Sequence, residues 1–277
     1  MESELKKVVL GVYRTAKSLE IPCVLVGALT SELSPEIGPD YPLFRRTNDA
    51  DFAVHVSDWA AFNKLRARLI ESGFTQHPKI EHRLLRGMVL VDLIPYGEGI
   101  APQGKLHWPE SEFEMNVTGF KEACAVANER VKAGGPQVPF ITIPGFVLLK
   151  IITFLDRKAR QEAKCQDDAR DILYWLTNYA SGTDDHRRFD VAAKMDGEVI
   201  NYSAAGAALL GLSVGQLASK EAGEVVEKFL QESGDLYSPF MDALAGIALD
   251  AAEDKKKRQV TLELLKAFDR GYERARP

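Results

Sequence analysis

Residues 49–56, with the sequence Asp-Ala-Asp-Phe-Ala-Val-His-Val, alternate in polarity as a half-buried β-strand does. Side chains alternate across a strand, so Asp49 and Asp51 are expected on one face and the apolar side chains on the other. A second strand-like run, residues 88–94, carries Asp92. If the two runs lie in one sheet, three carboxylates converge and repel one another unless divalent cations neutralise them. The pattern predicts a magnesium site for handling phosphates.

The same residues admit a structural interpretation. Asn-Asp and Asp-Ala pairs are common at turns, where an Asp caps a loop. Asp92 has apolar neighbours on both sides, which indicates a central strand buried on two faces. A lone carboxylate there is costly unless it binds metal or pairs with a cation. A salt bridge from Asp92 to a nearby Arg or Lys is therefore the alternative to a metal role.

Composition narrows the class of protein. The chain has 277 residues, enough for one large domain or two ordinary ones, and a net charge of -5. That charge argues against attraction of the whole surface to nucleic acid or anionic membrane. The three cysteines are widely spaced, which suggests reduced thiols. No signal-peptide core opens the sequence, and the most apolar stretch, residues 146–155, is too short to span a bilayer, so we expect a cytoplasmic protein without a membrane partner.

The order of patterns predicts an α+β protein, a mixed sheet with flanking helices followed by a helical domain. We expect an α/β domain over residues 1–140 and a helical domain over residues 141–277. Strands are expected at 22–26, 49–56, 82–85 and 88–94, the last two joined by a tight turn at Arg86-Gly87. Helices are expected at 2–19, from the N-cap Ser57 to Gly73, from Pro144, at 161–179, 204–210, 223–230, 237–251 and 261–272. Residues 97–139 are expected to form short strands and loops.

Lys150 lies in the otherwise apolar helix that begins at Pro144. An ammonium group there needs a counter-charge or a route to solvent. Asp168 and Asp171, three residues apart on one face of the next helix, can supply that counter-charge. Arg157 and the basic run 255–258 are expected on solvated helix surfaces.

Several segments resemble a known family. A buried strand ending in Gly27-Ala28, then Arg45-x-Thr47-x-Asp49-x-Asp51, then a third Asp on a later strand resembles the nucleotidyltransferase fold of the polymerase-β superfamily. Segments 26–29, 45–52, 91–97 and 149–150, with the Asp168-x-x-Asp171 pair, look like the abortive-infection (AbiEii-type) nucleotidyltransferase family. That family includes toxins of bacterial toxin–antitoxin pairs, and the resemblance covers about residues 20 to 180.

The resemblance implies a magnesium-dependent enzyme that transfers a nucleoside monophosphate from an NTP to a hydroxyl of RNA, such as tRNA, or of a protein, releasing pyrophosphate. Asp49, Asp51 and Asp92 would be catalytic and would bind two Mg²⁺ ions, with Asp92 also helping to deprotonate the acceptor. The residues Gly27, Ala28, Thr47, Lys150, Asp168 and Asp171 would bind the nucleotide. A toxin role would add an antitoxin as a partner.

Two positions depart from the family pattern. Ala28 stands where a second Gly or a Ser is usual, and Asp167 stands where a basic residue usually precedes the Asp-x-x-Asp pair. These departures support the alternative of a non-catalytic module on the same fold, sensing a nucleotide or binding a partner. A purely structural α+β protein, in which Asp92 lies far from Asp49 and Asp51, is the third interpretation.

Overall fold

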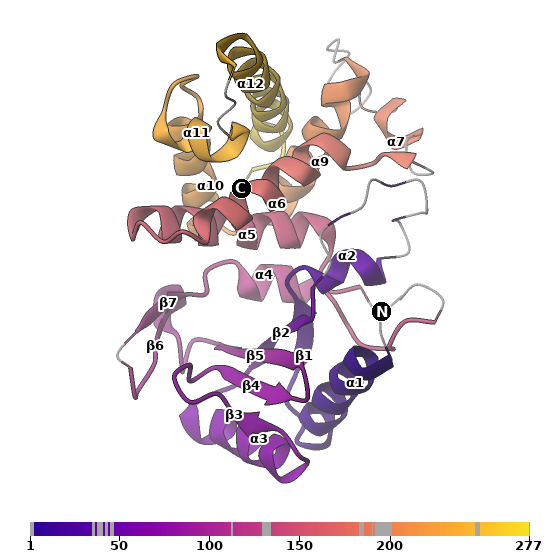
Figure 1. The fold of residues 1–277 in the computed structure, drawn as a ribbon, viewed down its shortest axis with the longest axis vertical. Helices are drawn as coiled ribbons and strands as arrows, with labels where there is room; N and C mark the ends of the chain where they lie inside the picture. The colour runs from indigo at the N-terminus through magenta and orange to yellow at the C-terminus, as the bar shows by residue number, and fades with distance from the viewer. Residues whose placement is uncertain are drawn as a thin grey trace. The chain divides into compact units, whose positions relative to one another are not determined.

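The computed structural model describes residues 3–34, 37, 41, 44, 47–111, 113–128, 134–182, 186–189, 191, 201–246 and 250–276. The chain divides into two compact units, residues 1–35 with 44–146 and residues 36–43 with 147–277. The first unit contains a mixed sheet with flanking helices and the second is helical, so the predicted α+β class is confirmed (Figure 1).

The sheet of the first unit has five strands in the order β1-β2-β5-β4-β3. Their bounds are β1 Cys23–Val26, β2 Asp49–His55, β3 Thr75–Gln76, β4 Arg83–Arg86 and β5 Val89–Tyr96. Strand β2 pairs with β5 in parallel and with β1 antiparallel, while β4 pairs with β5 and with β3 antiparallel. The third position in this order places β5, which carries Asp92, at the centre of the sheet.

One face of the sheet belongs to the core. Phe52, Val54, Val91 and Leu93 are almost fully buried on that face, as the alternating pattern predicts. Helices α1 (Ser3–Ser18) and α3 (Trp59–Glu71) contact each other and lie on one side of the sheet (Figure 1). The opposite face holds the acidic side chains, and there β5 is only partly buried, so the expected burial of β5 is complete on one face and partial on the other.

Several local expectations change in detail. Asp58, not Ser57, caps α3, because its side chain accepts a hydrogen bond from the Ala61 N–H. The β4–β5 loop is Gly87-Met88, since Arg86 already pairs with Val89. Between residues 97 and 139 the structure has the short elements η1 (Pro102–Gly104), β6 (Lys105–His107) and β7 (Glu114–Asn116), and also α4 (Phe120–Ala125), which the sequence pattern did not indicate. Helix α2 (Leu29–Leu33) follows β1 directly.

The described cysteines are all free thiols, as expected. Burial is the main reason that the pKa of the Cys23 thiol is raised. Burial also raises the pKa of the Cys124 thiol, to about 12. Thiols with such pKa values stay protonated near neutral pH and react slowly. Among the described residues, no helix combines the length and the apolar character that a bilayer crossing requires.

The second unit is built from helices. Their bounds are α5 Ile143–Ala159, α6 Cys165–Asn178, α7 His186–Phe189, α9 Tyr202–Leu217, α10 Lys220–Ser233, α11 Pro239–Ala245 and α12 Ala251–Glu273. The helix expected over residues 237–251 is shorter, because α11 ends before Gly246, whose φ is +66°. Asp250 then caps α12 by accepting hydrogen bonds from two N–H groups of its first turn.

Helices α9 and α12 cross at close range through glycines. A Cβ added at Gly211 of α9 would collide with the Phe268 carbonyl oxygen of α12, and one added at Gly271 of α12 would collide with the Ala208 carbonyl oxygen of α9. The absence of side chains at these two positions lets the backbones approach. Helix α9 is apolar around most of its circumference, and most of its residues are buried.

We predict that Gly211→Ala destabilises the protein by about 1–3 kcal/mol, because the new methyl group has no room beside the α12 backbone. Urea unfolding of wild type and variant measures this difference. Gly11→Ala is the matched control, since its methyl group would lie 3.6 Å from the nearest side-chain atom and in a helix should add up to about 1 kcal/mol of stability. Equal effects of the two substitutions would contradict the close crossing.

Candidate functional site

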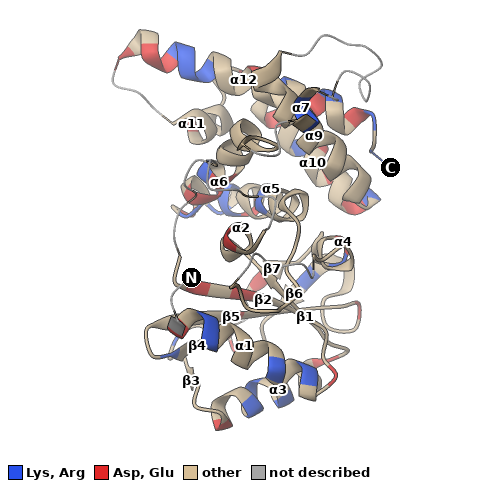
Figure 2. Cartoon of the chain, turned by 90° about the vertical axis from the view of Figure 1, so that its right-hand side faces the viewer, with Lys and Arg blue, Asp and Glu red and all other residues tan. Residues whose placement is uncertain are grey.

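The sheet brings the acidic residues together in one row. Asp51 of β2 lies directly opposite Asp92 of β5, and Asp92 lies directly opposite Arg83 of β4. Residues opposite each other in a sheet point to the same face, so these three side chains share it, and Asp49 joins them two residues before Asp51. The interpretation in which Asp92 lies far from Asp49 and Asp51 is therefore wrong. Figure 2 shows the acidic segment of β2 in red.

Arg83 binds both oxygens of Asp92. The Arg83 Nε–Asp92 Oδ1 and Arg83 Nη2–Asp92 Oδ2 distances are both 2.7 Å. The two side chains are 16% and 13% exposed, so solvent screens the pair only weakly. His82 Nε2 lies 3.9 Å from Asp92 Oδ2. The salt bridge that the sequence left as an alternative for Asp92 is present.

The negative charges of Asp49 and Asp51 also act on Arg83. Its hydrogen bonds to Asp92 raise the pKa of Arg83, burial opposes this shift, and the charges of Asp92, Asp49 and Asp51 raise it further. One guanidinium group therefore lies in the electrostatic field of all three aspartates. Sequence reasoning missed Arg83, although it stands on the strand that was expected to pair with the Asp92 strand.

Gly27 is required for a reason that the sequence did not reveal. It follows Val26, which pairs with Asp51, and it has a φ of +77°. A Cβ at this position would collide with Asp51 Oδ2. The glycine therefore leaves room for the Asp51 carboxylate as well as adopting a left-handed backbone conformation.

The other expected nucleotide-binding residues of this unit have local contacts. Ala28 is buried, and its carbonyl oxygen accepts a hydrogen bond from Ser31 Oγ at 2.8 Å. Thr47 Oγ1 accepts a hydrogen bond from the Asp49 N–H at 3.0 Å, which fixes the start of β2. The two arginines at positions 45 and 46, part of the resemblance, lie outside the described residues. A phosphate role for Ala28 and Thr47 stays a prediction.

The donor set fits a divalent cation in part. Asp49 and Asp51 supply the carboxylate oxygens that Mg²⁺ prefers. Asp92 already has a cationic partner, because Arg83 donates to both of its oxygens, and its role as a metal ligand stays a prediction. Among the described residues, no group of three or more His, Cys, Asp or Glu side chains has an arrangement that could hold a metal ion.

Lys150 forms a buried ion-pair cluster within the helical unit. Its Nζ lies 2.7 Å from Asp168 Oδ1 and 2.9 Å from Asp171 Oδ2. Asp168 and Asp171 are 0% and 1% exposed, and a nucleotide-binding role for them stays a prediction. Arg157 Nη1 binds the second oxygen of Asp168 at 2.7 Å, and the expectation of a merely solvated Arg157 is wrong. Two cations thus compensate two buried carboxylates, and a phosphate role of Lys150 stays a prediction.

A second ion-pair network involves a residue of the basic run 255–258. Lys255, Lys256 and Lys257 are exposed as expected, but Arg258 is buried. Arg258 Nε lies 2.6 Å from Asp254 Oδ2, and its Nη1 lies 2.5 Å from Asp242 Oδ1. The run therefore contributes to the packing of α12 against α11.

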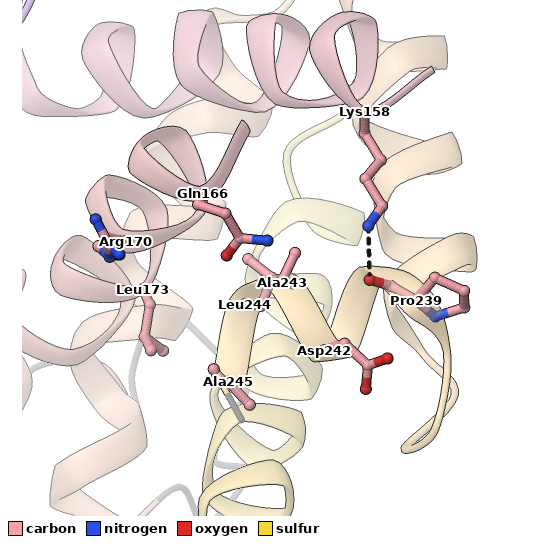
Figure 3. A pocket seen from close by; sticks show the side chains of 10 residues that line it. Lys158, Gln166, Arg170, Leu173, Pro239, Asp242, Ala243, Leu244 and Ala245 are labelled. Carbon is pink, nitrogen blue, oxygen red and sulfur yellow. Dashed lines mark hydrogen bonds between the residues drawn. The ribbon is translucent and has the colours of Figure 1, made fainter. Parts of the chain in front are cut away.

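A cavity of about 590 Å³ also lies in the helical unit, between α6, α11 and the end of α5 (Figure 3). Its charged lining residues have partners: Lys158 Nζ donates to the Pro239 carbonyl at 3.0 Å, Arg170 binds Asp167 at 2.9 Å, and Asp242 binds Arg258. These contacts connect the helices that line the cavity, and none of them indicates a ligand.

Comparisons with known proteins add little at the level of sequence. No protein-family model matches the chain, and no curated protein matches it significantly. A solution structure of the antibiotic-resistance factor ANT(2'')-Ia overlaps with a TM-score of 0.40 at 12% identity, covering 62% of this chain and 84% of that one. A crystal structure of ANT(2'')-Ia with adenylyl-2''-tobramycin gives 0.39 at 13% identity, covering 62% and 88%. An overlap of this size assigns no activity to this chain.

We predict that Lys150→Met costs about 3–5 kcal/mol of stability, because it removes the cation that two buried carboxylates share. Lys164→Met, at an exposed position in the same unit, should change stability by less than about 0.5 kcal/mol. Chemical unfolding of both variants measures the difference. A Lys150→Met protein as stable as the Lys164→Met protein would show that the cluster has no structural role.

Proposed function

We propose that the chain is a metal-dependent nucleotidyltransferase that moves a nucleoside monophosphate from an NTP to a hydroxyl acceptor. One observation carries the proposal: Asp51 lies directly opposite Asp92 on adjacent parallel strands, with Asp49 on the same face. Gly27, whose missing side chain leaves room for the Asp51 carboxylate, supports it. The resemblance of segments 26–29 and 45–52 to nucleotidyltransferases agrees with this assignment.

The reaction follows from the chemistry of phosphoryl transfer. The acceptor oxygen attacks the α-phosphorus, the bond from that phosphorus to the oxygen bridging to the β-phosphorus breaks, and pyrophosphate leaves with the electron pair. The hydroxyl proton passes to water. A bound divalent cation would supply charge neutralisation at the phosphate oxygens.

The residues of the chain would act mainly by positioning. Asp49 and Asp51 would hold the cation and so fix the triphosphate against the face of the sheet that they share. The backbone after Gly27 would line the phosphates. In phosphoryl transfer, positioning and charge stabilisation supply most of the rate.

The resemblance supplies the acceptor classes, a hydroxyl of RNA, such as tRNA, or of a protein. A toxin role with an antitoxin as partner belongs to the same proposal. The net charge of -5 gives some weight against an extensive nucleic-acid interface.

A second candidate is a non-catalytic module that binds a nucleotide or a partner. The Arg83–Asp92 pair favours it, because a carboxylate whose two oxygens bind a guanidinium group is not a ready general base or metal ligand. The buried Ala28 methyl group, at a position where the family has Gly or Ser, points the same way.

We predict that the wild type binds an NTP in the presence of Mg²⁺ and that Asp49→Asn/Asp51→Asn weakens this binding by roughly tenfold or more, because the carboxylate ligands are lost. Isothermal titration calorimetry with each NTP, with and without Mg²⁺, measures the effect. The control Glu71→Gln/Glu114→Gln removes two exposed carboxylates of the same unit and should bind like the wild type.

The transfer step is tested with α-³²P-labelled NTPs and total tRNA, or the protein itself, as acceptor. Label in the acceptor with the wild type and none with Asp49→Asn/Asp51→Asn supports the enzyme. Nucleotide binding that needs no Mg²⁺ and is unchanged by both Asp substitutions, without label transfer, would contradict the enzyme activity and favour the non-catalytic module.

A further inference from the structure

We infer that Arg83 takes the place of a second cation beside Asp92, so that the acidic site holds one divalent cation per chain rather than two. This inference rests on the proposed function, because it assigns the remaining ion of that site to Asp49 and Asp51. It changes the role of Asp92 from metal ligand to positioning residue for Arg83.

The Arg83–Asp92 pair has the geometry of a strong ion pair. Arg83 Nε and Nη2 bind Asp92 Oδ1 and Oδ2, each at 2.7 Å. Bidentate, charge-assisted hydrogen bonds of this length are among the strong ones in proteins. An ion approaching Asp92 would meet the positive charge of a guanidinium group that already donates a hydrogen bond to each oxygen.

The fold itself places Arg83 against Asp92. Arg83 and Asp92 are direct cross-strand partners in β4 and β5, so the backbone itself sets the two side chains against each other. Their exposures of 16% and 13% leave little solvent to screen the attraction. His82 Nε2 lies 3.9 Å from Asp92 Oδ2, and the His82 ring contacts the Trp108 ring at a centroid distance of 5.3 Å and a tilt of 44°.

A single Mg²⁺ ion needs few protein ligands when a nucleotide is bound. Mg²⁺ is commonly held by one or two carboxylates together with substrate phosphates and water. Asp49 and Asp51, two residues apart on strand β2, supply two carboxylates on one face of the sheet. Arg83, whose charge cannot be removed near neutral pH, supplies positive charge at the position where a second ion would contact Asp92.

Counting bound Mn²⁺ by electron paramagnetic resonance, with a non-hydrolysable NTP analogue present, tests the inference without relying on activity. The expected count is one ion per chain in the wild type and in Asp92→Asn, and none in Asp49→Asn/Asp51→Asn. The wild-type count decides the matter even if a variant fails to fold.

Substitutions at Arg83 test whether its positive charge keeps a second ion away from Asp92. In Arg83→Gln a second Mn²⁺ should bind at Asp92, because the competing positive charge is gone. Its affinity should be roughly tenfold or more higher than that of any second ion in the wild type. Arg83→Lys should keep the count at one, since it retains the charge. Arg86→Gln is the control, because this exposed residue is on the same strand but pairs with Val89 and does not contact Asp92.

Two results would overturn the inference and leave the proposed function intact. One is a count of two ions in the wild type, and loss of one of them in Asp92→Asn would identify Asp92 as its ligand. The other is an Arg83→Gln protein that melts like the wild type and still binds one ion. No ion in the wild type with nucleotide present would instead overturn the proposed function.

Discussion

A carboxylate in the middle of a sheet needs a partner, and in this chain the partner of Asp92 is Arg83, on the neighbouring strand β4. The pair allows an acidic row to exist on the central strands without a metal ion bound to Asp92. Asp51 completes the row from the other neighbouring strand, and Gly27 gives its carboxylate room. The candidate site thus depends on one cross-strand ion pair and one missing side chain.

In the helical unit, too, buried charged side chains are paired with opposite charges. Asp168 and Asp171 are buried, and Lys150 and Arg157 bind them at hydrogen-bond distance. Arg258 is likewise buried against two carboxylates. In each case burial makes the partner obligatory, because an unpaired charge in a protein interior is costly. In this chain, a charged residue in apolar surroundings therefore indicates a structural ion pair first and a ligand-binding residue second.

Much of the fold was readable because alternation and helical periodicity are local properties. The strands around Asp49 and Asp92 and the buried helix that starts near Pro144 followed from such patterns. The partner of Asp92 did not follow, because register depends on the exact turn. A turn at Arg86-Gly87 would set Asp92 opposite Glu81, whereas the observed turn at Gly87-Met88 sets it opposite Arg83. A shift of one residue in the turn changes which side chain meets the acid.

The most direct test of this account is where a cation and a nucleotide bind. Crystals grown with Mn²⁺ and a non-hydrolysable NTP analogue would locate the ion by its anomalous scattering. The account predicts one peak in contact with the carboxylates of Asp49 and Asp51, with Arg83 still bound to Asp92. A nucleotide bound with no peak at these two carboxylates would contradict it.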